Sequence, residues 1–192
     1  MRRIGVINGN AELAACFFNM KHGKLISFSG GRSSAMMLKI MLDNGMVDAN
    51  TVVAFANTGK EREETLEFVR DCGEAFGVKI WWVEYIPEKP LYRIVDFDTA
   101  SRSGEPFEAL TRRAKYLPNA VQRICTGDLK IKPINRLMKK ELGFSGYVKY
   151  MGIRADELSR YLKLKDTAEM PLFDFNVTKQ HVRTFWDAQP FD

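Results

Sequence analysis

Cysteine and histidine are scarce in this 192-residue chain, and their scarcity excludes several kinds of site. The cysteines are Cys16, Cys72 and Cys125; they are odd in number, widely spaced and form no CxxC pair. The sequence therefore predicts no disulfide framework, no complete cysteine metal site and no iron–sulfur cluster. The two histidines, His22 and His181, lie far apart in the sequence, so we expect no histidine catalysis and no protein metal ligands.

Long apolar runs are also missing. Polar residues interrupt the N-terminal apolar patch at Asn8, Asn10 and Glu12, and no later run reaches membrane-spanning length. The sequence thus predicts a soluble, cytoplasmic protein without a signal peptide or membrane contact. Its composition is 45% hydrophobic, enough for one core, and its net charge of +5 permits a phosphorylated or nucleic-acid partner without requiring one.

Two well-known phosphate loops are absent, because no GxGxxG occurs and the Gly59-Lys60 pair lacks the spacing of a Walker A loop. Instead, an apolar strand at 25–28 runs into a serine–glycine bend and an apolar helix at 35–42, with Ser33 or Ser34 as the expected N-cap. Main-chain N–H groups at such a helix start attract anions. The predicted phosphate contacts are Ser29, Gly30, Gly31, Arg32, Ser33 and Ser34. A tight turn that only caps a helix remains the alternative.

The order of the predicted elements indicates an α/β protein. Further strands are expected at 51–56, 78–85 and 147–151. Helices are expected at 11–20, 106–114 and 178–187. Two more helices are expected, one after a capping box formed by Thr58 and Glu61 and one between Pro133 and Gly143. Alternating strands and helices favour a mostly parallel sheet with helices on both faces, a Rossmann-like three-layer α/β/α sandwich. We expect a helical N-terminal extension at 1–23 and a single domain at 24–192.

Several polar residues follow predicted strands, where ligands of such sheets bind. Asn57, Thr58 and Gly59 form a turn expected to lie beside the serine–glycine bend, around the crevice where the strand order reverses; it serves as a helix cap, a nucleotide contact or both. Arg154 is placed to bind phosphate or sulfate, while Asp156 and Glu157 either contact ligand or cap the next helix.

Cys125 precedes the helix expected after Pro133 and has Lys130 close in the sequence. These neighbours favour a reactive thiolate, and the alternative is a buried, inert cysteine.

Four segments in this order, SFSGGRSSA, ANTGKEREET, CTGDLKIKP and GIRADE, followed by PLFDFNVTKQHVRTFW, resemble those of phosphoadenosine phosphosulfate (PAPS) reductase-like proteins. These proteins form a branch of the PP-loop adenine-nucleotide alpha-hydrolase superfamily. The resemblance implies that the serine–glycine bend grips the phosphates of an adenine nucleotide and that Asn57 to Gly59 border it. It also implies that Lys130, Arg154 and Arg160 neutralise its phosphate or sulfate end.

The resemblance implies an enzyme of sulfur metabolism that acts on the phosphate or sulfate end of PAPS, APS or ATP, with Cys125, Lys130 and Arg154 as catalytic candidates. Mg²⁺ is a further cofactor to consider. The sequence differs from the family pattern at Ser33, where many such proteins carry Asp. It also differs in having no cysteine after Cys125. We therefore expect that a cysteine-bearing C-terminal tail is truncated or naturally lacking. Two alternatives stay open: ATP-dependent activation of tRNA or DNA for sulfur transfer, and a non-catalytic nucleotide sensor. The expected partners include nucleic acid, a sulfur-donor protein and a second copy of the chain.

Overall fold

A five-stranded sheet forms the centre of the computed structural model, which describes residues 21–114 and 125–191. Its strands are β1 (His22–Phe28), β2 (Thr51–Asn57), β3 (Ile80–Glu84), β4 (Arg93–Val95) and β5 (Gly146–Met151). They lie in the order β4-β3-β2-β1-β5; only β4 is antiparallel to its neighbour. This mostly parallel sheet confirms the predicted α/β, Rossmann-like class. The helix expected at 11–20 lies outside the described residues.

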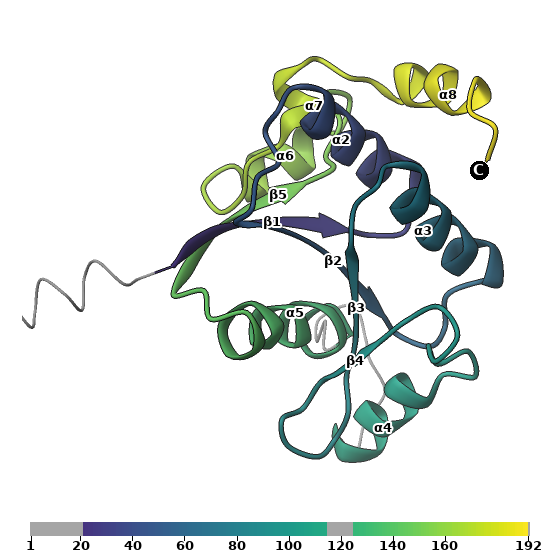
Figure 1. The fold of residues 1–192 in the computed structure, drawn as a ribbon, viewed down its shortest axis with the longest axis vertical. Helices are drawn as coiled ribbons and strands as arrows, with labels where there is room; N and C mark the ends of the chain where they lie inside the picture. Colours follow the sequence, from purple (N-terminus) through teal and green to yellow (C-terminus); the bar gives the residue numbers. More distant parts are fainter. Residues whose placement is uncertain (1–20, 115–124, 192) are drawn as a thin grey trace, which may run out of the picture.

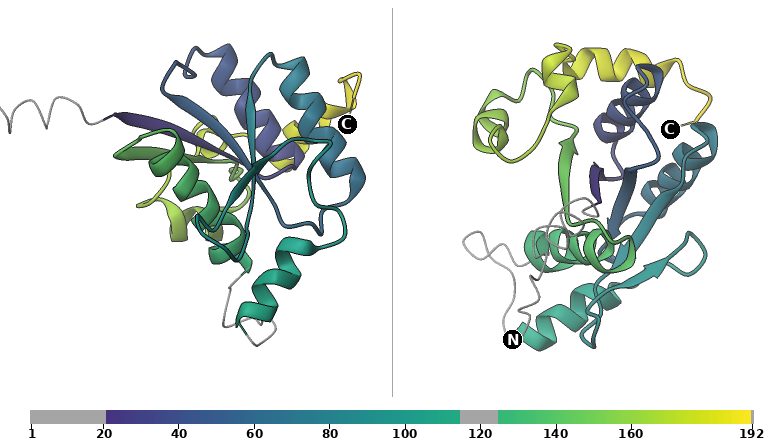
Figure 2. Two further views of the ribbon diagram at one scale, coloured as in Figure 1. Left: turned by 60° about the horizontal axis from the view of Figure 1, so that its bottom comes forward. Right: turned by 60° about the vertical axis from the view of Figure 1, so that its left-hand side comes forward.

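Helices cover both faces of the sheet (Figure 1). On one face lie α2 (Arg32–Asp43), α3 (Glu63–Ala75) and α8 (Lys179–Asp187), whose apolar residues share a core with β1 and β2. On the other face lies one helical run made of η1 (Cys125–Ile131), α5 (Lys132–Arg136) and η2 (Leu137–Glu141). The remaining helices are α4 (Glu105–Ala114), α6 (Leu158–Leu164) and α7 (Pro171–Asp174). Figure 2 shows α8 lying against α2.

The central strand β1 is buried on both faces, as its apolar run predicts. Ile26 and Phe28 belong to the core beneath α2, whereas Leu25 points to the core beneath α5, and each is at most 2% exposed. Side chains of this size each stabilise the fold by about 1.5–3 kcal/mol when they leave water. The strand therefore holds a fixed position from which the polar bend that follows it is presented.

Three predicted boundaries are wrong. β1 begins at His22, three residues before the predicted start at 25, so Gly23 lies inside the strand and not in the predicted helical extension. The N-cap of α2 is Gly31, because the Ser34 hydroxyl bonds back to the Gly31 carbonyl from within the first turn. At the expected capping box, the Thr58 hydroxyl donates to a Glu61 carboxylate oxygen at 2.9 Å and accepts from the Lys60 N–H at 3.4 Å, so the contact lies before the helix and does not cap it. Helix α3 starts later, after Arg62.

The sheet topology also corrects the predicted place of the crevice. From β1 the chain moves outward through β2 and β3 to β4, then returns to add β5 on the other side of β1. The strand order therefore reverses between β1 and β5, so the turn at 57–59 does not border the reversal. The short strand β4 was not among the predicted strands, and helical structure begins at Cys125, before the predicted start near Pro133.

Within the described ranges, no helix combines the length and the apolar character that a membrane crossing requires.

Candidate functional site

A pocket opens where the strand order reverses, at the carboxyl ends of β1 and β5. We call it the switch-point pocket; its volume is about 290 Å³. One wall comes from β1 and the start of α2: Ser27, Ser29, Gly31, Arg32, Ser33 and Ser34. The other wall follows β5: Met151, Gly152, Ile153, Arg154, Glu157 and Arg160. Ligands of open α/β sheets bind at this kind of reversal.

The serine–glycine bend is held open by one side chain. The Ser34 hydroxyl donates to the Gly31 carbonyl at 2.7 Å and accepts hydrogen bonds from the N–H and the hydroxyl of Ser29, at 3.1 and 3.0 Å. Its single hydrogen is therefore used, so Ser34 shapes the bend and has no proton left for a ligand. Among the described residues, the main-chain N–H groups of Gly30, Gly31 and Ser33 have no hydrogen-bond partner, which leaves them available to an anion.

Gly152 allows β5 to meet α2 closely. A Cβ atom at this position would lie 2.9 Å from the Cα and 3.0 Å from the nitrogen of Ser34, both main-chain atoms. Gly30 is a second constrained glycine, because its φ of +76° favours glycine and a Cβ there would meet the Thr65 methyl group at 2.8 Å. Gly152 therefore sets the distance between the two walls of the pocket, and Gly30 lets the bend pack closely against α3.

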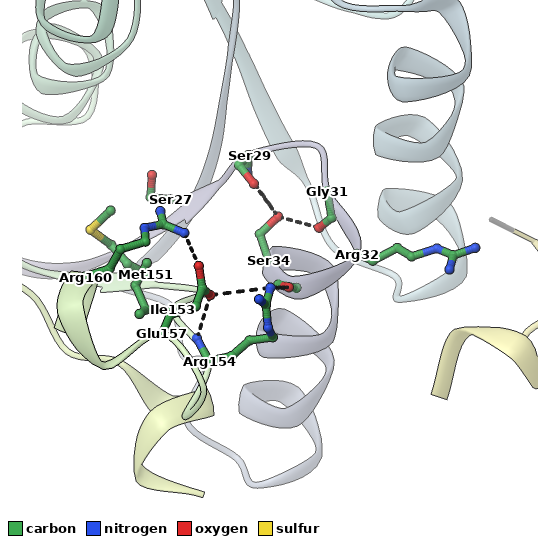
Figure 3. A pocket seen from close by; sticks show the side chains of 12 residues that line it. Ser27, Ser29, Gly31, Arg32, Ser34, Met151, Ile153, Arg154, Glu157 and Arg160 are labelled. Atoms are coloured by element: carbon green, nitrogen blue, oxygen red, sulfur yellow. Dashed lines mark hydrogen bonds and ion pairs between the residues drawn. The ribbon is translucent and has the colours of Figure 1, made fainter. Parts of the chain in front are cut away.

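Two arginines and one carboxylate dominate the charge of the pocket (Figure 3). Arg154 donates to the Ser33 hydroxyl at 3.1 Å and to Asp156 at 2.9 Å, and its guanidinium lies 3.4 Å from the Glu157 carboxylate. Arg160 forms an ion pair with the same carboxylate. Glu157 thus holds both guanidinium groups at the pocket, whereas the Arg32 side chain points away from this cluster.

The two carboxyl groups of this loop remain ionised to lower pH than usual. Desolvation acts to raise the pKa of Glu157, but the Arg154 N–H and the ion pairs with both arginines outweigh it and lower the pKa. Desolvation likewise opposes ionisation of Asp156, but the hydrogen bond and charge of Arg154 together with main-chain N–H groups outweigh it and lower the pKa. Since both carboxylates are engaged by arginine, they do not fit a Mg²⁺ site, and the described residues contain no cluster of three metal-ligating side chains.

Asn57 and its neighbours lie in a separate buried network. Asn57 is fully buried, donates to Glu84 at 2.6 Å and to the Ser101 carbonyl at 2.8 Å, and accepts from the Gly59 N–H at 3.0 Å. The Glu84 carboxylate is also buried and is 2.7 Å from the Arg93 guanidinium. The polar groups of Asn57 are therefore engaged within the fold, and none of Asn57, Thr58 and Gly59 lines the switch-point pocket.

A larger cavity of about 600 Å³ adjoins the pocket on the α5 face of the sheet and shares Ser27, Met151 and Arg160 with it. We call it the basic cavity. Lys130 lines it and lies 3.3 Å from Glu61. Cys125 lines neither space; it is half-buried against an apolar cluster that includes Leu129.

The structure thus brings together most, but not all, of the predicted site residues. All of the bend except Gly30 shares one pocket with Arg154, Glu157 and Arg160, and Asp156 is a partner of Arg154. Sequence reasoning did not assign Gly152 to the site, although a glycine directly after a predicted strand is the signal that marks a close backbone approach. It also gave no role to Glu84, because a buried acid is recognised only once its partners are known.

Comparison with known proteins gives one relevant match, and no family model matches the chain. The chain is 32% identical over 184 residues to the uncharacterized nin region protein ORF290 of Escherichia phage lambda. The match covers 88% of this chain and 60% of that protein, so the chain spans about 60% of the length of the curated relative it matches.

Proposed function

We propose that the switch-point pocket binds the phosphate or phosphosulfate end of an adenine nucleotide and that the protein acts on that end. The observation that carries the proposal is the convergence of the Arg154 and Arg160 guanidinium groups with the unpaired N–H groups at the start of α2. Guanidinium groups bind phosphate oxygens through paired hydrogen bonds, and helix amides add further donors. The adenine specificity and the place in sulfur metabolism rest on the resemblance to PAPS reductase-like proteins.

The pocket residues would take distinct roles in this activity. Amides of the bend and the Ser33 hydroxyl, which keeps its own proton, would donate to phosphate oxygens. Arg154 and Arg160 would offset charge that develops on the transferred or leaving group. Glu157 would pair with the two arginines until ligand phosphate replaces it as their partner. The proposal places this activity in the cytoplasm, with the nucleotide as substrate.

A non-catalytic nucleotide-binding protein is the second candidate. The specific observation in its favour is the position of Cys125, the only nucleophilic candidate of the sequence, which packs against an apolar cluster and lines neither the pocket nor the basic cavity. A protein that only binds the nucleotide would need the same arrangement of the two arginines but no reactive thiol.

Thermal-shift titration tests the binding step. ATP and PAPS should raise the melting temperature more than AMP, since a ligand at about 100 times its Kd stabilises the folded state by about 2.7 kcal/mol. Arg154→Ala should remove most of the shift. The matched control is Arg183→Ala, which removes an exposed arginine of α8 that lies outside the pocket. Equal shifts with the two variants, or no shift with any nucleotide, would refute the proposed site.

Turnover separates the two candidates. The enzyme should release pyrophosphate from ATP or, with a dithiol present, sulfite from PAPS. Tight binding without release of either product would support the sensor.

A further inference from the structure

We propose that the basic cavity holds one nucleotide of a single-stranded polynucleotide, whose neighbouring phosphates contact lysines on the cavity walls. The inference rests on the proposed function, because it treats the cavity as the binding place of a second substrate beside the reactive end of the adenine nucleotide. Ser27, Met151 and Arg160 line both spaces, so occupants of the two would touch.

Lys149 is the first observation that points to an anionic occupant. It lies on β5 in register with the buried Leu25 of β1, is half-buried, and lines the cavity. Within residues 21–114 and 125–191 its ammonium group has no hydrogen bond or ion pair. A half-buried lysine gives up part of its hydration and its side-chain freedom, and without an anion it gains nothing in return. Lys149 therefore fits a site that is completed by a negatively charged ligand.

The cavity walls concentrate the positive charge of the whole chain. The run from η1 to η2, Lys149, and residues 158–167 together carry nine Lys or Arg against three Asp or Glu, a net charge of +6, whereas the entire chain carries +5. Among the described residues that line the cavity, none is acidic. Lys163, on α6, resembles Lys149 in having no ion pair within the described residues. Such one-sided charge attracts polyanions.

Apolar side chains supply the other half of the site. Leu25, Ile134 and Leu164 line the cavity, and Ile131 lines it while 44% exposed to solvent. A volume of about 600 Å³ lies within the range of about 300–1,000 Å³ that is typical of pockets for small molecules and single nucleotides. A base can rest between apolar side chains while its phosphates stay at a charged rim. The cavity has both parts.

A polynucleotide strand fits the cavity better than a free mononucleotide does, because the positive charge extends beyond the cavity. Lys139 and Lys140 lie exposed on η2, and Lys165 lies exposed just after α6, on the helical segments that form the two walls. One nucleotide has too few phosphates to reach these lysines as well as those inside. Consecutive phosphates of a strand would contact both groups.

Fluorescence anisotropy of the full chain with labelled oligothymidylate and oligouridylate of about twelve nucleotides tests the inference. At least one should bind, and log affinity should fall linearly with log salt. Lys163→Gln should weaken binding about three- to tenfold and reduce the magnitude of the salt slope by about 0.7, the loss of one phosphate contact. Lys39→Gln is the matched control, since Lys39 lies on α2 across the sheet and pairs only with Asp43 among the described residues. It should leave the slope unchanged.

Lys149→Met separates binding from structural support. A lysine that supports the fold would lower the melting temperature when replaced, whereas a lysine kept for ligand should leave it equal or raise it while oligonucleotide affinity falls. Neither lysine variant should alter the rise in melting temperature caused by ATP or PAPS. The thermal shift therefore tests binding of the adenine nucleotide, and the anisotropy tests binding of the oligonucleotide, independently of each other. The inference is overturned if neither oligonucleotide binds at about 50 mM salt, if Lys39→Gln weakens binding as much as Lys163→Gln, or if UMP and dTMP compete as well as the oligonucleotides.

Discussion

Replacing Gly152 by alanine tests whether the close contact between β5 and α2 builds the switch-point pocket. The new Cβ would lie 2.9, 3.0 and 3.1 Å from the Cα and nitrogen of Ser34 and the carbonyl carbon of Ser33. All three are main-chain atoms, so no side chain can turn aside, and either α2 or the end of β5 must shift. Overpacking of this kind costs about 1–3 kcal/mol. In a domain of this size each kcal/mol lowers the melting temperature by about 2–4 °C.

The shift should also weaken ligand binding, because it moves the amides of the bend away from Arg154. We therefore expect Gly152→Ala to melt about 3–10 °C below the wild type and to lose most of the thermal shift caused by ATP or PAPS. Gly127→Ala is the control, since a Cβ at Gly127 meets no atom within 4 Å in the helical run η1. It should be neutral or slightly stabilising. A Gly152→Ala protein that melts with the wild type and responds fully to nucleotide would refute the reasoning.

Three further outcomes follow from buried or paired ionisable groups. Glu157→Gln should tighten pyrophosphate binding about fivefold, or about 1 kcal/mol by calorimetry, because a carboxylate no longer competes for the arginines. The pKa of Glu157 is lowered from an ordinary 4.5, so its ionised carboxylate stabilises the fold above pH 4.5. This stabilisation is lost as the pH falls through the lowered pKa. The melting temperature of Glu157→Gln should therefore drop less than that of the wild type between neutral and acid pH. Glu84→Ala should cost about 1–3 kcal/mol in urea unfolding, because it leaves the buried Asn57 amide and the Ser101 N–H without their acceptor; a loss of only a few tenths would exclude a structural role. Burial raises the pKa of Cys72 to about 12, so peptide mass mapping after iodoacetamide should find it unmodified in the native protein.

The sequence was a good guide where local pattern and long-range packing agree. The apolar run at 25–28 predicts a strand buried on both faces, and Ile26 and Leu25 occupy opposite cores as expected. β4 escaped prediction because it has only three residues and two of them are exposed. Its pairing depends on Glu84 and Arg93, which meet only in the folded sheet.

Site residues were predictable when they follow a strand directly, as the bend and Arg154 do. Their grouping was less predictable, because strand order is a tertiary property and the sequence does not tell on which side of β1 the last strand pairs. The role of Ser34 could not be read either. A serine near a helix start suggests a cap, and only its distances to Ser29 and Gly31 show that it shapes the bend from inside the first turn.

The pairing of the first and last described strands would determine how the protein responds to the proposed ligand. β1 and β5 lie next to each other, although β2, β3 and β4 come between them in the sequence, and β5 is an edge strand. An anion bridging the bend and Arg154 would fasten that edge to the centre of the sheet. Amide hydrogens of β5 should then exchange more slowly when nucleotide is present, so this edge strand would report occupancy of the pocket.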